Sequence, residues 1–187
     1  HTESTKLNKN KITILGPAHG KQACGDGGYG RMLEPEQIFY AVQELFSKKE
    51  GLFKGKKVII VNVASRCGYT SQYKKLQELY EKHSDKLEII AVPCNDFGYQ
   101  EPGSANQIKD FCELNYGVTL SIASKQKIKS SPQSYLYDWL SDPKLNGWND
   151  QLPSWNFCKY VISEKGELMH FFRSSVDPLS KEFLNIL

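Results

Sequence analysis

The chain has 187 residues, of which 40% are hydrophobic and 12% aromatic, and its formal net charge is +3. These values are those of one globular domain with a sizeable core, and they exclude a disordered chain. No apolar run approaches the roughly 18 residues that a transmembrane helix needs, and so small a charge requires neither nucleic acid nor an anionic membrane as a partner.

The first part of the chain carries a glycine motif but little periodicity. Residues 1–33 are rich in Lys, Asn and Gly, and only Ile12–Leu15 has the composition of a short strand. Gly25, Gly27 and Gly30 match the G-x-G-x-x-G pattern of dinucleotide-binding sites. That pattern should follow a buried strand and open a helix, which the flanking residues do not predict. A flexible glycine loop is therefore the favoured interpretation.

An amphipathic helix is expected over residues 35–48, where apolar side chains recur at helical spacing. Gly51 and Gly55 then interrupt this pattern. We therefore divide the chain into an N-terminal extension of uncertain structure, residues 1–50, and one domain, residues 51–187.

Strands and helices alternate in the first half of this domain. Val58–Val63 is a nearly continuous β-branched run, typical of a strand buried on both faces of a sheet. Leu87–Val92 is a second such strand, and helices with one apolar face are expected at 70–83 and 104–116. Two strands joined by a helix at these lengths indicate a βαβ unit with a right-handed crossover.

The last third of the chain predicts a further helix, a hairpin and a short final helix. The helix covers residues 132–141, and the strands Phe157–Ser163 and Glu167–Phe172 flank a Glu-Lys-Gly turn. Asp177-Pro178 opens a final helix that ends near Leu187. The order of elements predicts an α/β fold with a central mixed β-sheet flanked by helices.

Cys67 is placed where α/β proteins carry their functional sites. The segment Asn62–Thr70 runs from the end of a buried strand to the start of a helix, and functional crevices of parallel sheets lie at that end. Backbone N–H groups and the helix dipole favour an anion there, and Arg66 adds a positive charge. These features favour a thiolate at Cys67, and the alternative is an unreactive buried cysteine.

The spacing Cys67-x-x-Thr70 resembles a dithiol redox motif whose second cysteine is replaced. Such a site cannot close a local disulfide, so its oxidised form must be a sulfenic acid or a distant disulfide. No two of the five cysteines are spaced C-x-x-C and no histidine flanks them, so no metal site is expected.

Three separate segments together resemble the glutathione peroxidase family. They are Asn62–Thr70, Pro93–Ser104 and Trp155–Phe157, and they occur in the family's order. The resemblance covers residues 51–175 and implies a thioredoxin-like fold with a divergent N-terminal extension, which agrees with the order of elements. Residues 51–187 are then a thioredoxin-like peroxidase domain.

The resemblance implies roles for four side chains. Cys67 matches the family's peroxidatic residue, Gln100 matches the glutamine of the second motif, and Trp155 and Asn156 match the third motif. Amide and indole N–H groups can donate to a thiolate, and to a peroxide oxygen as it becomes an anion. Without the motifs, Gln100 would be read as a solvated loop residue and Trp155 as a core aromatic.

The resemblance also implies a second redox cysteine. Phe111–Thr119 is similar to the segment that carries the resolving cysteine in members that use thioredoxin, and it contains Cys112. Part of a helix must then move before the two sulfurs can meet. The alternative is that Cys112 is a small core residue. No catalytic role is expected for the remaining cysteines, Cys24, Cys94 and Cys158.

The sequence departs from the family's pattern at several places. Asp96 replaces a usual glutamine and is expected to add negative charge near the site, and Val92 replaces a usual aromatic residue. The stretch Leu120–Lys127 lacks the usual Phe-Pro-containing strand, and residues 1–50 do not follow the usual N-terminal β-hairpin.

The function implied by the resemblance is that of a thiol peroxidase. It would reduce hydrogen peroxide or organic and lipid hydroperoxides through a sulfenic acid on Cys67, which Cys112 would resolve. Thioredoxin or glutathione would be the reducing co-substrate, with no bound cofactor or metal. Two alternatives stay open at this point: a redox sensor that passes its oxidation to a partner thiol, and a structural subunit with a vestigial peroxidase core.

Partners and location are expected as follows. A monomer is expected, because the segment between Leu140 and Trp155 is short and tetrameric members of the family carry a longer insertion there. Neither a nucleic-acid partner nor stable membrane insertion is expected. The absence of a signal-peptide pattern and of Asn-x-Ser/Thr acceptors favours a cytoplasmic or organellar protein, with secretion as the alternative.

Overall fold

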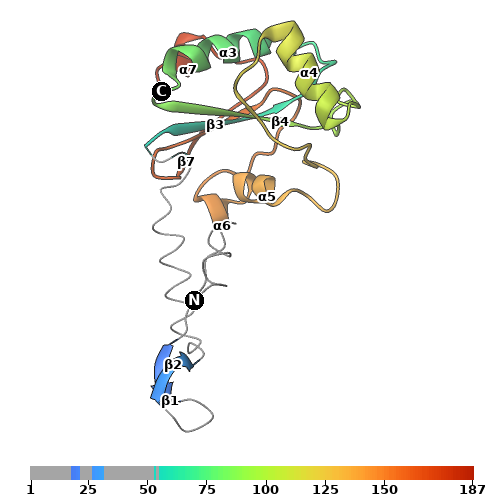
Figure 1. Cartoon of the computed structure of the whole chain (residues 1–187). Coiled ribbons are helices and arrows are strands. Elements are labelled where there is room, and N and C mark those ends of the chain that lie inside the picture. The colour runs from blue at the N-terminus through green and yellow to red at the C-terminus, as the bar shows by residue number, and fades with distance from the viewer. Residues whose placement is uncertain (1–17, 22–26, 32–52, 54) are drawn as a thin grey trace. The chain divides into compact units, whose positions relative to one another are not determined.

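The chain divides into two compact units, His1–Gly51 and Leu52–Leu187 (Figure 1). The computed structural model describes residues 18–21, 27–31, 53 and 55–187. Among these residues, no helix combines the length and the apolarity that crossing a bilayer requires.

The first unit contains a two-stranded antiparallel sheet, formed by β1 (Ala18–Lys21) and β2 (Gly27–Arg31). The expected glycine loop is therefore wrong for Gly27 and Gly30, which lie in β2. Strand pairing uses backbone groups alone, so strands without apolar alternation leave no periodic signal in the sequence. The other features expected here, Gly25, the strand at Ile12–Leu15 and the helix at 35–48, lie outside the described residues.

The second unit is built on a five-stranded sheet with the strand order β5-β4-β3-β6-β7. Its strands β3, β4 and β5 are parallel, whereas β6 pairs antiparallel with both β3 and β7. The sheet is therefore mixed, as the sequence predicts. The strand bounds are β3 Lys57–Val63, β4 Leu87–Pro93, β5 Ser121–Ile122, β6 Lys159–Ile162 and β7 Leu168–Phe172.

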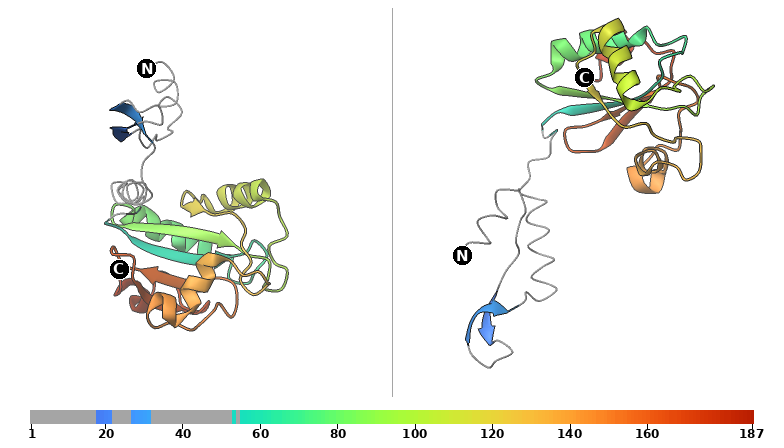
Figure 2. Two further views of the ribbon diagram at one scale, coloured as in Figure 1. Left: turned by 90° about the horizontal axis from the view of Figure 1, so that it is seen from below. Right: turned by 45° about the vertical axis from the view of Figure 1, so that its right-hand side comes forward.

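Helices cover both faces of this sheet (Figures 1 and 2). On one face lie α3 (Gln72–His83), α4 (Ala105–Tyr116) and α7 (Lys181–Leu184), and on the other lie α5 (Tyr135–Ser141) and α6 (Pro143–Asn146). Alternate residues of β3 enter the two cores. Ile59 and Val61 pack under α3 and α4, and Val58 and Ile60 pack toward α5. This double burial explains the nearly continuous apolar run of β3.

Several boundaries differ from the expected ones. Phe157 is outside β6 because its φ of 66° is incompatible with a strand. The last helix begins at Lys181 and not at Asp177, because Ser180 caps it by accepting a hydrogen bond from the Phe183 N–H. The stretch Leu120–Lys127 does contain a strand, β5, although only two residues long, and the four-residue helix α6 was not expected.

Candidate active site

The topology of the sheet brings three loops to one end. Because β3 and β4 are parallel, the segments that follow them, which carry Cys67 and Gln100, leave the sheet at the same end. Because β6 runs antiparallel to β3, the segment that precedes it, which carries Trp155 and Asn156, arrives at that end as well. The Phe157 N–H donates to the Asn62 carbonyl, which joins this last segment to β3. Residues from distant parts of the chain therefore share one site.

Cys67 lies in a tight turn that Thr70 holds. The Cys67 N–H donates to Thr70 Oγ1 at 2.9 Å, and that hydroxyl donates to the Ala64 carbonyl at 2.9 Å. The Tyr69 N–H donates to Cys67 Sγ at 3.4 Å. The sulfur is therefore an acceptor of a backbone hydrogen bond. Cys67 is 9% exposed, so it is largely shielded from solvent but not fully enclosed.

Thr70 explains the spacing noticed in the sequence. It occupies the position of the second cysteine of a dithiol motif, but it contributes a structural hydroxyl that bridges both ends of the turn. The sequence did not predict this role, because a threonine is common at the start of a helix. Its hydrogen bonds to the Cys67 N–H and the Ala64 carbonyl leave no distinct pattern in the sequence.

Gln100 and Asn156 contact each other directly. Asn156 Nδ2 donates to Gln100 Oε1 at 3.0 Å and approaches the Phe97 carbonyl at 3.4 Å. Asn156 is fully buried, so its amide orientation is fixed by these partners. Because the oxygen of the Gln100 amide is occupied, its N–H groups are the part left to bind another group. The Arg66 N–H donates to the Gln100 carbonyl at 3.1 Å, which joins this loop to the residue preceding Cys67.

Trp155 is partly exposed and packs on the same loop. Its ring lies edge-on to Phe97, with the centroids 6.3 Å apart, and 39% of its surface is accessible. Its carbonyl accepts from Asn62 Nδ2 at 2.9 Å, and Asn62 Oδ1 accepts from the Cys158 N–H at 2.9 Å. Asn62 therefore fixes the chain on both sides of Asn156. The sequence does carry a signal for it, since an amide interrupts the apolar run of β3.

Asp96 does not present a free charge to the site. One of its oxygens accepts from the backbone N–H groups of Ile128, Lys129 and Ser130, and the other accepts from the Ser130 hydroxyl. Burial by itself would raise the pKa of Asp96, but these hydrogen bonds outweigh it and hold the pKa below its usual value. The carboxylate of Asp96, expected to add negative charge near the site, is therefore hydrogen-bonded to the neighbouring loop of residues 128–130.

Cys112 lies in a different environment, on α4 and fully buried in the core. Burial raises the pKa of its thiol. The helix is capped at both ends, by a capping box between Ser104 and Gln107 and by Gly117 in the left-handed conformation. Opening this helix must therefore break defined contacts before Cys112 can reach another sulfur.

The four described cysteines are all free and buried. Cys94 is fully buried, and burial raises the pKa of its thiol to about 11, so it is unreactive at neutral pH. Within the described part of the chain, no three His, Cys, Asp or Glu side chains gather in a way that could hold a metal ion.

Comparison with known proteins adds independent information. The family model for glutathione peroxidase matches residues 42–141. Over 128 residues the chain is 46% identical to glutathione peroxidase-like peroxiredoxin 2 of Saccharomyces cerevisiae, covering 68% of this chain and 79% of that protein. Over 131 residues it is 38% identical to the glutathione peroxidase of Lactococcus lactis, covering 70% and 83%.

Solved structures agree with this family and with the fold. The structure of T. cruzi GPX1 is 26% identical and superposes with a TM-score of 0.52, covering 74% of this chain and 82% of that chain. A thioredoxin-like protein in its oxidised form, 18% identical, superposes with a TM-score of 0.53 over 73% of this chain and 81% of that chain. The second likeness bears on the fold alone, which is thioredoxin-like.

Proposed function

The chain belongs to the glutathione peroxidase family, and we propose that it is a thiol peroxidase that reduces hydrogen peroxide or organic and lipid hydroperoxides with Cys67 as its nucleophile. The observation that carries this proposal is the placement of Cys67 at the sheet end where the Gln100–Asn156 pair and Trp155 also lie. A sulfur that accepts a backbone hydrogen bond and is slightly exposed suits attack on a small oxidant.

In the first step the Cys67 thiolate attacks one oxygen of the peroxide. The O–O bond breaks, Cys67 becomes a sulfenic acid, and the other oxygen leaves as water or an alcohol after gaining a proton. The N–H groups of Gln100 and Trp155 are the donors proposed to stabilise the oxygen as it becomes an anion. Asn156 orients Gln100 by holding its amide oxygen.

In the second step Cys112 resolves the sulfenic acid. Its sulfur attacks the Cys67 sulfur, a disulfide forms and water leaves, so that the two cysteines together have given two electrons to the peroxide. A dithiol protein of the thioredoxin kind then reduces this disulfide, and glutathione is the alternative reductant. The name of the yeast relative, a peroxiredoxin, supports a cycle carried by protein thiols.

The proposal is tested by two serine variants in a peroxide assay that couples turnover to NADPH through thioredoxin or through glutathione. Cys67→Ser should lose nearly all turnover with either reductant, because serine is not ionised at neutral pH. Cys112→Ser should keep the first oxidation step but lose turnover with thioredoxin. In the wild type, peroxide should lower the mass by two hydrogen atoms as the disulfide closes.

Cys94→Ser is the matched control, since Cys94 is buried like Cys112 and has no proposed role. It should cycle normally. Retained turnover in Cys67→Ser would overturn the function, whereas normal cycling of Cys112→Ser with thioredoxin would overturn only the resolving role and the choice of reductant.

A further inference from the structure

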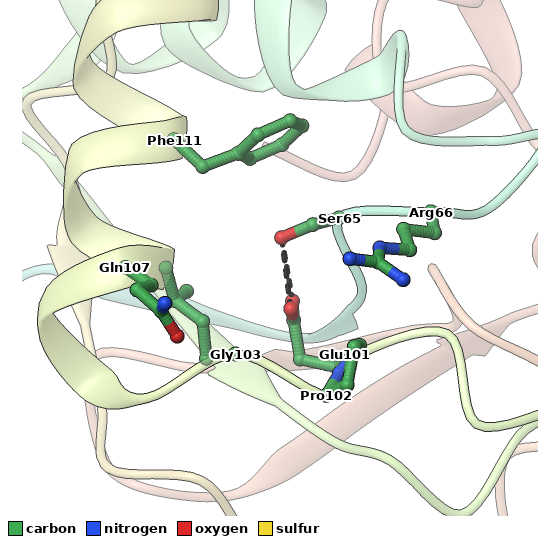
Figure 3. Close-up of a pocket in the computed structure, with 8 residues that line it drawn as sticks. Ser65, Arg66, Glu101, Pro102, Gly103, Gln107 and Phe111 are labelled. Carbon is green, nitrogen blue, oxygen red and sulfur yellow. Dashed lines mark hydrogen bonds between the residues drawn. The ribbon is translucent and has the colours of Figure 1, made fainter.

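A cavity of about 350 Å³ separates the Cys67 loop from α4. Ser65 and Arg66 line it from the loop, and Gln107 and Phe111 line it from the helix (Figure 3). Arg66 precedes Cys67 in the chain, and Phe111 precedes Cys112. The cavity therefore lies between the two segments that must approach each other if the two sulfurs are to bond.

One buried carboxyl group, that of Glu101, stands on the wall of this cavity. Glu101 is 1% exposed, and its two oxygens accept from the Ser65 hydroxyl at 2.8 and 3.1 Å (Figure 3). None of the ion pairs found among the described residues includes it. The positive charges of Lys125 and Arg66 lower the pKa of its carboxyl group. Lys125 Nζ also donates a hydrogen bond to the backbone carbonyl of Glu101 at 2.8 Å.

The environment of Glu101 makes its carboxylate a stronger base than a carboxylate in water. Burial raises its pKa, although the Ser65 hydrogen bond and the charges of Lys125 and Arg66 oppose that effect. The sequence position of Glu101, directly after Gln100, brings this base close to the proposed site without giving it any role in the first oxidation step.

The charge of Glu101 affects the pKa of two further buried groups. Burial raises the pKa of both the Tyr73 phenol and the Cys112 thiol, and the negative charge of Glu101 raises each further. Contact with the Tyr73 side chain opposes these effects on Cys112, because its hydrogen bond lowers the pKa of the thiol. Glu101 thus lies within electrostatic reach of the buried thiol that the proposed cycle must deprotonate.

We propose that Glu101 is the proton acceptor of the resolving step. When α4 opens and Cys112 enters the cavity, the Glu101 carboxylate takes the thiol proton as the Cys112 sulfur attacks the Cys67 sulfenic acid. The S–O bond breaks, the S–S bond forms, and the proton held by Glu101 passes to the departing hydroxide, which leaves as water. No proton is gained or lost overall, so one carboxyl group serves as base and then as acid. This inference rests on the proposed function.

The decisive comparison is between Glu101→Gln and Glu113→Gln. Glu113 is an exposed glutamate on α4 whose charge also raises the pKa of Cys112, so the control removes a similar charge without touching the cavity.

Enzyme is mixed with one equivalent of peroxide and quenched with a sulfenic-acid trap, and mass spectrometry measures the amounts of sulfenic acid and disulfide over time. Glu101→Gln should form the sulfenic acid at the wild-type rate and close the disulfide roughly 10²-fold more slowly. Glu113→Gln should match the wild type in both steps.

The pH dependence separates a proton acceptor from a structural contact. In the wild type, the rate of disulfide closure should fall as the pH drops through the raised pKa of Glu101, because the carboxylate is then protonated. This acid limb should be missing in Glu101→Gln. Ser65→Ala removes a hydrogen bond that lowers the pKa of Glu101, so its acid limb should move to higher pH, and this variant decides the matter if Glu101→Gln does not fold.

Three results would overturn the inference. They are disulfide closure at the wild-type rate in Glu101→Gln, an equal slowing of oxidation and closure with the acid limb unchanged, and an acid limb that does not move in Ser65→Ala. If instead the wild type formed no disulfide between Cys67 and Cys112, the proposed resolving step would fail, whatever Glu101 does.

Discussion

Gly98 offers a direct test of how closely the loops of the site are packed. Its φ of 66° lies in the left-handed region, and a Cβ added there would lie 3.2 Å from Cη2 of Trp155 and 3.5 Å from Cγ of Gln100. Gly98→Ala therefore combines backbone strain with a close contact on the Trp155 ring, whereas its contact with Gln100 is an ordinary van der Waals distance. The ring of Trp155 has to shift by a few tenths of an ångström.

Gly166 provides the matched control. It has a φ of 84° in the turn before β7, and no atom lies within 4 Å of the Cβ that alanine would add. Alanine in the left-handed region costs about 1–2 kcal/mol, part of which is offset by a less flexible unfolded chain. Backbone strain should therefore cost each variant about 1 kcal/mol of stability, which corresponds to roughly 3–6 °C in Tm for a domain of this size.

The two variants should differ in activity. A displacement of about 1 Å can cost roughly 10²-fold in rate, so the smaller shift in Gly98→Ala should lower kcat/KM for peroxide by about 5–10-fold. Gly166→Ala should keep kcat/KM within about 2-fold of the wild type, since nothing at the site moves. Thermal unfolding and stopped-flow peroxide kinetics on both proteins give the comparison. Equal kcat/KM in the two variants, at equal loss of Tm, would refute the packing argument.

Gln100→Ala should lower kcat for peroxide by about 10²-fold, because loss of an oriented donor costs roughly 2.7–4 kcal/mol in well-studied sites; an unchanged rate would remove Gln100 from the mechanism. Burial lowers the pKa of Lys159 from 10.5 to about 8. As the pH rises, the Lys159 ammonium group therefore loses its proton in the folded state at a lower pH than in the unfolded state. The stability of the wild type relative to Lys159→Met should therefore be lowest below pH 8 and should rise by about 3 kcal/mol toward pH 10.5; denaturant unfolding at pH 7 and pH 10.5 measures this, and a flat difference would contradict it. Light scattering should give a monomer of 21.3 kDa, and a stable tetramer at micromolar concentration would contradict that expectation.

The parts of the fold that the sequence predicted are those in which local pattern and burial agree. Val58–Val63 reads as a strand because both of its faces are buried, and α3 and α4 show apolar faces at helical spacing. The parts it missed have no such local signal. The strand β5 is two residues long and pairs only with β4, and the positive φ of Phe157 places a β-favouring residue outside its strand.

The residues proposed for the site could be named from the sequence, but their contacts could not. The position of Cys67 follows from the strand–helix order, and the loop residues follow from their motifs. The hydrogen bond between Asn156 and Gln100 joins residues 56 positions apart, and only the register of β3 with β4 and β6 brings them together. The partners of Asp96 are likewise set by tertiary structure, since its carboxylate binds backbone groups more than 30 residues away.

The contrast between the two cysteines suggests how the fold would order the proposed cycle. Cys67 sits at a loop with a hydrogen bond already aimed at its sulfur, whereas Cys112 is buried in a helix whose two caps must yield before it can react. Oxidation of Cys67 would therefore need no rearrangement, whereas the disulfide could close only after α4 opens. Since an N-cap contributes about 1 kcal/mol, the stability of α4 would set how long a sulfenic acid on Cys67 survives in the proposed cycle, and with it the chance that an external thiol reaches Cys67 before Cys112 does.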